Sequence, residues 1–235
     1  MNNTVYNFSA GPCVLPKEVF SKCAEEMMNY NGTGLCVMEM SHRSKEFIDI
    51  SDRAKDDLRT FLQIPDNFKI FLFQGGASLQ YAAIIKNLLK TGKGSAPCYV
   101  TTGLWSNQCL NEAKKMLPED NQPVEIATSR DCNYTKLKNP SQWRKIDPNA
   151  SYVHYCQNET VHGYQFKNGM DDDEDTHFPF HLVPKGVPVV CDMSSDIGSR
   201  KVDWSKYGMV YAGAQKNLGT SGCTVCIIRE DLIGK

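Results

Sequence analysis

Hydrophobic and polar positions along the chain follow two different periods. Apolar side chains recur three or four residues apart over residues 16–30 and 47–61, which predicts two amphipathic helices. Short apolar runs predict strands at residues 70–73, 99–101, 152–156, 187–191 and 209–212, and helical stretches at 79–89 and 106–117 follow the first two runs. Strands that alternate with helices favour parallel pairing through crossover connections. The sequence therefore predicts an α/β fold with a mainly parallel sheet flanked by helices.

Two stretches lack either period and predict loops. Residues 133–149 are rich in Pro, Asn, Lys and Ser, and residues 167–185 contain an acidic run from Asp171 to Asp175 followed by His177 and His181. The acidic run is either a metal site or a solvated loop. We favour the loop, because five adjacent carboxylates cannot all converge on one ion. We therefore expect no metal site.

Composition and charge exclude several classes of protein. The 235 residues carry a formal net charge of −1, which argues against the cationic face of a nucleic-acid binder. No stretch approaches the roughly 18 apolar residues of a membrane helix, and the first residues lack a signal-peptide pattern. We therefore expect a cytoplasmic protein without nucleic-acid or membrane partners. The ten cysteines, Cys23, Cys109, Cys156, Cys191 and Cys226 among them, are then expected to be free thiols, mostly buried. Cys223 and Cys226 have the spacing of a metal-binding or redox pair, but the apolar run at 224–228 predicts a strand. Two residues three positions apart on a strand point to opposite faces, which argues against such a role.

Chemistry-bearing residues follow five of the predicted strands. In an open parallel sheet, ligands bind beyond the carboxyl ends of the strands. The residues found there are a Gly-Gly-Ala-Ser turn at 75–78, then Trp105, Thr160, Asp192, and the pair Gln215 and Lys216.

Each of these residues also has a purely structural interpretation. The turn that holds Ala77 and Ser78 is either an anion cradle at a helix start or a tight turn capped by serine. Trp105 either stacks on a ligand ring or belongs to the core. Asp192 either faces a cation or caps a turn, since an unpaired buried carboxylate is costly. Lys216 at a buried strand end favours covalent or acid–base chemistry.

Together the residues fit one ligand, pyridoxal 5′-phosphate (PLP). Lys216 would form an imine with its aldehyde, and Asp192 would keep the ring nitrogen protonated. Trp105 would stack on the ring, and Thr160 would bind the ring hydroxyl or its oxygen neighbours. The phosphate would be held by Ala77, Ser78 and Gln215.

Six segments resemble one known family. They are residues 7–12 (NFSAGP), 37–43 (VMEMSHR), 74–80 (QGGASLQ), 154–160 (HYCQNET), 191–195 (CDMSS) and 211–217 (YAGAQKN). The chain resembles the phosphoserine aminotransferases, in the class V branch of the fold-type I PLP enzymes. The resemblance implies a PLP-binding large domain of three layers and a homodimer. It also implies reversible amino transfer from O-phospho-L-serine to 2-oxoglutarate in serine biosynthesis, giving 3-phosphohydroxypyruvate and L-glutamate. Lys216 would be the catalytic residue, and His42 and Arg43 would bind the substrate.

The resemblance also sets an expected domain organisation. Residues 1–15 would form an N-terminal segment and residues 16–235 the large domain, and the family's C-terminal small domain would be absent. We then expect weak or no transamination by this chain alone. Two alternatives stay open: another class V transaminase, and a noncatalytic module that binds PLP or dimerises. The Ser-His-Arg and Asn-Glu-Thr segments argue against the first alternative.

Overall fold

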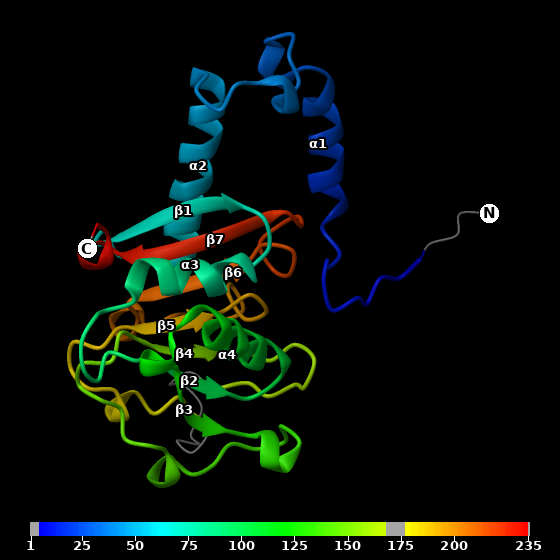
Figure 1. Ribbon diagram of the computed structural model, residues 1–235. Coiled ribbons are helices and arrows are strands. Elements are labelled where there is room, and N and C mark those ends of the chain that lie inside the picture. The colour runs from blue at the N-terminus through cyan, green and yellow to red at the C-terminus, as the bar shows by residue number, and fades with distance from the viewer. Residues whose placement is uncertain (1–4, 168–176, 235) are drawn as a thin grey trace. The chain divides into compact units, whose positions relative to one another are not determined.

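The computed structural model of the chain describes residues 5–167 and 177–234, and the chain divides into two compact units, Met1–Pro65 and Asp66–Lys235. The first unit contains two of the predicted helices, α1 (Lys17–Met28) and α2 (Lys45–Leu62) (Figure 1). Ser44 begins α2 as its N-cap, where its hydroxyl accepts a hydrogen bond from the Phe47 amide at 3.3 Å. Helix α1 contains no buried residue, so the apolar side of α1 stays exposed.

The second unit is built on one seven-stranded sheet. Its strands are β1 (Phe68–Gln74), β2 (Cys98–Thr101), β3 (Val124–Thr128), β4 (Val153–Cys156), β5 (Val189–Asp192), β6 (Met209–Gly213) and β7 (Cys223–Arg229). Their order across the sheet is β1-β7-β6-β5-β4-β2-β3. Strands β6, β5, β4, β2 and β3 are parallel, which confirms the mainly parallel sheet.

Two strands depart from the predicted pattern. Strand β7 pairs antiparallel with both β1 and β6, so β1 is not a member of the parallel series. Two antiparallel steps restore the direction, and β1 therefore runs the same way as β6. As a result the turn after β1 still lies at the edge where the parallel strands end. Strand β3 was not predicted from the sequence.

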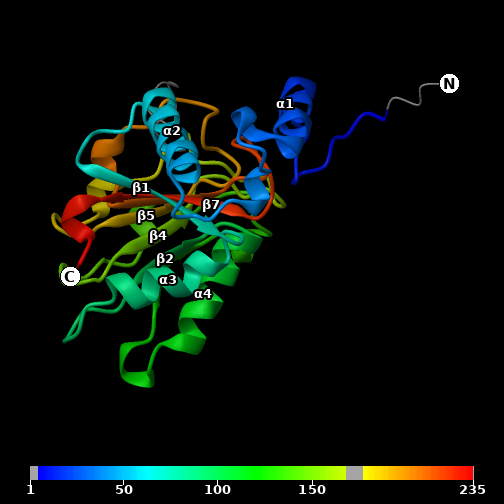
Figure 2. The same cartoon turned by 90° about the horizontal axis from the view of Figure 1, so that it is seen from above.

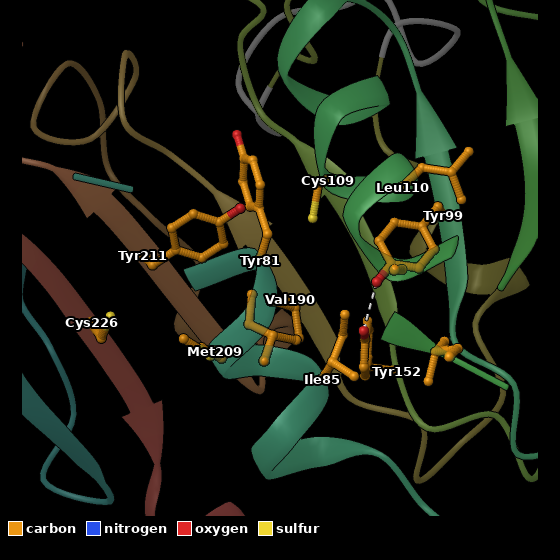
Figure 3. Packing of buried hydrophobic residues seen from close by; sticks show 13 residues of the cluster. Tyr81, Ile85, Tyr99, Cys109, Leu110, Tyr152, Val190, Met209, Tyr211 and Cys226 are labelled. Atoms are coloured by element: carbon orange, nitrogen blue, oxygen red, sulfur yellow. Dashed lines mark hydrogen bonds between the residues drawn. The ribbon is translucent and has the colours of Figure 1, made fainter. Parts of the chain in front are cut away.

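Helices α3 (Leu79–Leu88) and α4 (Leu104–Met116) cover one face of the sheet (Figures 1 and 2). Side chains of both helices pack with strand residues in a buried cluster, in which the hydroxyls of Tyr99 and Tyr152 lie 2.6 Å apart (Figure 3). The opposite face carries an aromatic cluster from β4 and the loops that follow β4 and β5, comprising Tyr155, Phe166, Phe178, Phe180 and Tyr207. The predicted layered α/β class is confirmed.

Three smaller expectations concern the thiols, the acidic run and membrane-spanning helices. All ten cysteines are free thiols, and six of them are buried, whereas Cys23 on α1 is exposed, contrary to the prediction. The acidic run from Asp171 to Asp175 lies outside the described residues. Within residues 5–167 and 177–234, no helix has the length and apolar character needed to cross a bilayer.

Candidate functional site

The turn after β1 and the turn after β6 are tied together by the start of β7. The Gly75 amide donates to the Gly222 carbonyl at 2.9 Å, and the Thr224 hydroxyl donates to the Gly75 carbonyl at 2.9 Å. The Ala214 amide, directly after β6, donates to the Cys223 carbonyl at 2.9 Å. The two turns that carry Ser78 and Lys216 are therefore fixed at the same edge of the sheet.

Lys216 lies in a tight turn that follows β6. The amides of Leu218 and Gly219 both donate to the Ala214 carbonyl, at 3.2 and 2.8 Å, which closes the turn around the lysine. The Lys216 side chain is partly buried, and its Nζ donates to the Thr160 hydroxyl at 3.3 Å. Thr160 follows β4, so the structure brings together two residues that are 56 positions apart in the sequence.

Asp192 is the last residue of β5 and is 6% exposed. Its Oδ1 accepts hydrogen bonds from the Ser194 amide at 2.9 Å and the Ser194 hydroxyl at 2.6 Å, and that hydroxyl accepts in turn from the Gly213 amide at 3.0 Å. This chain of contacts connects the end of β5 to the end of β6, three residues before Lys216. Burial raises the pKa of the Asp192 carboxyl, and the two bonds from Ser194 oppose that rise. The neutral donors of Ser194 stabilise the Asp192 carboxylate, and the nearby charge of Glu159 destabilises it. A cation bound next to Asp192 would therefore stabilise the carboxylate further.

Trp105 is held through a residue to which the sequence analysis gave no role, Glu159. Trp105 lies in the first turn of α4, and its amide donates to Glu159 Oε2 at 3.0 Å. The Ser106 amide donates to Glu159 Oε1 at 2.9 Å, and the Ser106 hydroxyl also binds that oxygen. Glu159 is fully buried, so its carboxylate satisfies the N-terminal amides of α4 where the helix dipole favours a negative charge.

The contacts of Glu159 also explain the glycine at position 103. A Cβ at Gly103 would lie 2.6 Å from the carboxyl carbon of Glu159, so no larger residue fits between the helix start and the carboxylate. Because Thr160 directly follows Glu159, one anchored segment positions both Trp105 and Thr160. Glu159 could have been suspected from the sequence only as an acidic residue adjacent to Thr160.

The turn at 75–78 presents backbone amides rather than a serine cap. Ser78 is the N-cap of α3, but its side chain makes no capping hydrogen bond. Among the residues that the structure describes, none accepts a hydrogen bond from the amides of Ala77 or Ser78. Two amides at a helix start remain available to an anion. The Gln215 side chain folds back against Gly213, where an added Cβ would lie 2.6 Å from its Oε1.

His42 and Arg43 belong to the first unit. Both are exposed in the turn before α2, and the Arg43 amide donates to the Ser41 hydroxyl at 3.3 Å. Their assignment to the substrate stays a prediction.

Comparison with known proteins supplies the family. The sequence pattern of the family described as Aminotransferase class-V matches residues 5–235. The chain belongs to the class-V aminotransferases. The matched region includes the mainly parallel sheet, the lysine after β6 and the aspartate at the end of β5.

Relatives of this class-V chain carry a more specific name. The phosphoserine aminotransferases of Chromobacterium violaceum and Drosophila melanogaster are 47% and 46% identical to it, each over 98% of this chain. The solved structure of PLP-bound phosphoserine aminotransferase from Trichomonas vaginalis superposes with a TM-score of 0.85 at 36% identity, over 99% of this chain and 63% of that one. The phosphoserine aminotransferase of Bacillus circulans subsp. alkalophilus gives a TM-score of 0.84 at 40% identity, over 100% and 60%. The chain spans 59% and 58% of the length of the first two relatives.

Proposed function

We propose that this chain binds PLP and carries the chemistry of a phosphoserine aminotransferase, with weak or no turnover by the chain alone. It would transfer the amino group of O-phospho-L-serine to 2-oxoglutarate, giving 3-phosphohydroxypyruvate and L-glutamate in serine biosynthesis. The observation that carries the proposal is the contact between Lys216 and Thr160 at the edge of the sheet where the buried Asp192 ends β5, in a chain whose relatives are phosphoserine aminotransferases.

The residues at this edge fit PLP. The buried Asp192 carboxylate suits the protonated ring nitrogen, because burial disfavours an anion that has no cation beside it. The unused amides of Ala77 and Ser78 suit the phosphate. Trp105 is half-buried at the helix start that Glu159 anchors, which suits a ring-stacking role. Gln215, directly before Lys216, would also contact the phosphate.

PLP, when bound, supplies an aldehyde that condenses with amines and a protonated ring that accepts electron density from the substrate. The chain's own residues supply the proton transfers. Lys216 Nζ would act as the base that takes the proton from the substrate Cα and later returns a proton. The Thr160 hydroxyl, which lies 3.3 Å from that amine, would bind the ring hydroxyl or its oxygen neighbours. Asp192 would hold the ring nitrogen in its protonated form throughout.

Further parts of the proposal concern recognition and assembly. His42 and Arg43 would bind the anionic ends of the substrates, since both substrates carry two anionic groups. Residues 16–235 would form the large PLP-binding domain, preceded by the segment 1–15. The protein would act as a homodimer in the cytoplasm.

A substrate-specific half-reaction tests the proposal. The purified chain is loaded with PLP, and its absorbance spectrum is recorded before and after addition of O-phospho-L-serine, with L-alanine as the comparison. We expect phosphoserine, but not alanine, to convert the cofactor to its aminated form and to yield one equivalent of 3-phosphohydroxypyruvate per site. An equal response to alanine would favour another class V transaminase. A PLP-loaded chain that responds to neither would favour the noncatalytic module.

A further inference from the structure

A buried polar pair lies behind Asp192 on the helix-covered face of the sheet. Asp192 on β5 pairs with Tyr211 on β6, and His154 on β4 pairs with Val190, two residues before Asp192. Paired residues on neighbouring strands share a face, as do residues two apart on one strand. His154, Tyr211 and Asp192 therefore all point toward α3 and α4.

Two of these side chains are hydrogen-bonded to each other, and the third lies beside them on the same face of the sheet. His154 Nε2 lies 2.9 Å from the Tyr211 hydroxyl, and Tyr211 is the residue that pairs with Asp192 on the neighbouring strand. Tyr211 lowers the pKa of the Asp192 carboxyl, against the larger rise caused by burial. His154 and Tyr211 are fully buried. Figure 3 shows Tyr211 beside Tyr81 and Cys109 within the packed cluster between the helices and the sheet.

The protonation of His154 gives this hydrogen bond a direction. Burial lowers the pKa of His154 to about 3, so the ring is neutral near neutral pH and carries one N–H group. Its Nδ1 is buried and has no hydrogen-bond partner. A proton on Nδ1 would be an unsatisfied buried donor, which is rarer in proteins than an unsatisfied acceptor. The proton therefore belongs on Nε2, from which it is donated to the Tyr211 oxygen, and Tyr211 is free to donate its own proton to Asp192.

Other titratable groups also face Asp192. The groups that interact with it are Tyr81 of α3, Cys109 of α4, Cys156, Cys191, Cys226 and Glu159, and Lys216 lies in the turn after β6 at the same edge. Burial raises the pKa of each of these thiols and of Tyr81, so they are neutral near neutral pH. Cys109 Sγ, 3.5 Å from His154 Nε2, is only a weak donor. Glu159 raises the pKa of Asp192 by charge repulsion and so makes its ionisation harder.

We propose that His154 and Tyr211 form a directed hydrogen-bond relay that keeps the Asp192 carboxylate ionised, so that Asp192 can hold the protonated ring nitrogen of PLP. The last part of this statement rests on the proposed function. His154 and Tyr211 are positioning residues, since they act through Asp192. In this relay Tyr211 would supply a donor to Asp192 in addition to the two bonds from Ser194, and His154, which is hydrogen-bonded to Tyr211, would polarise that donor.

The relay is tested on the full chain by NMR titration of isotope-labelled aspartate carboxyl groups, first without PLP. Asp192→Asn identifies the Asp192 signal. We expect Tyr211→Phe to raise the pKa of Asp192 by about one unit or more, the size of a lost hydrogen bond to a charged group. We expect His154→Phe to raise it by less. The matched control is Tyr155→Phe, which removes a buried hydroxyl from the opposite face of the same sheet; it should leave the Asp192 pKa unchanged.

Three results would overturn the relay. One is an unchanged Asp192 pKa in Tyr211→Phe, and another is an equal rise in Tyr155→Phe. The third needs no variant: NMR of the wild-type chain must find the His154 proton on Nε2, and a proton on Nδ1 contradicts the direction. Addition of PLP labelled at its ring nitrogen then separates the two claims. Failure of PLP to bind would contradict the proposed function and leave the pKa results standing, whereas bound PLP with a protonated ring nitrogen supports both.

Discussion

Replacement of Glu159 by glutamine tests how the first turn of α4 is held. The variant keeps the size of the side chain but removes its charge, and it places an amide N–H group against a backbone N–H donor. Glu159 accepts bonds from the Trp105 and Ser106 amides at 3.0 and 2.9 Å and from the Ser106 hydroxyl, all in a buried site. A hydrogen bond to a charged group contributes about 1.5–3 kcal/mol, and a charge at a helix N-terminus adds about 0.3–1 kcal/mol. Since the glutamine side chain retains one acceptor oxygen, we expect Glu159→Gln to lose about 2–4 kcal/mol in the free energy of unfolding.

Urea unfolding followed by circular dichroism measures the loss, and PLP binding is titrated in parallel. The matched control is Glu112→Gln on the same helix, which removes a solvent-exposed pair with Lys115 at 3.6 Å. That pair should contribute about 0.5 kcal/mol or less to the free energy of unfolding. Glu159→Gln should also weaken PLP binding, because Trp105 and Thr160 are both positioned through this segment, whereas the control should not. Equal stability losses in the two variants would refute the assignment of Glu159 as the anchor of the α4 N-terminus.

Three further predictions concern neighbouring features. Gly103→Ala should lower the free energy of unfolding by about 1–3 kcal/mol, because the added methyl group overpacks against Glu159. The control Gly76→Ala has nothing within 4 Å of its added Cβ, so it should change the midpoint of urea unfolding little. Equal effects of the two variants would contradict the packing argument. Burial raises the folded-state pKa of Asp192 above its unfolded value, so the cofactor-free chain loses stability as the pH rises between those two values. The free energy of unfolding of Asp192→Asn, minus that of wild type, should therefore increase with pH between those two pKa values and stay constant at higher pH. If denaturant unfolding gives a difference that does not change with pH, the raised pKa of Asp192 is contradicted. PLP binding should quench the fluorescence of wild type more than that of Trp105→Phe, and identical quenching would remove Trp105 from the cofactor site.

The sheet edge was predictable because it depends on local sequence. Short apolar runs identify strands, and the parallel arrangement follows from their alternation with helices, so the residues after the strands can be expected at one edge. Asp192 and Lys216 were found in this way, and the structure connects their strands through Ser194 and Gly213. Strand β3 was missed because Glu125 interrupts its short apolar pattern.

What the sequence could not predict depends on long-range contacts. The antiparallel placement of β7 between β1 and β6 requires knowledge of strand order, which local periodicity does not contain. Glu159 meets the start of α4 across 53 positions, and His154 meets Tyr211 across 57. Each of these residues is polar and buried, and a buried polar group is stable only when it has a hydrogen-bond partner. The partners lie far away in the sequence, so local patterns do not reveal them.

Covalent trapping of the cofactor tests the central claim most directly. The chain is loaded with PLP, reduced with sodium borohydride and digested, and mass spectrometry identifies the lysine that carries the pyridoxyl group. We predict modification at Lys216, and its loss in Lys216→Ala while the variant remains folded. Labelling of a different lysine in the wild-type chain, or undiminished labelling of Lys216→Ala, would contradict the account.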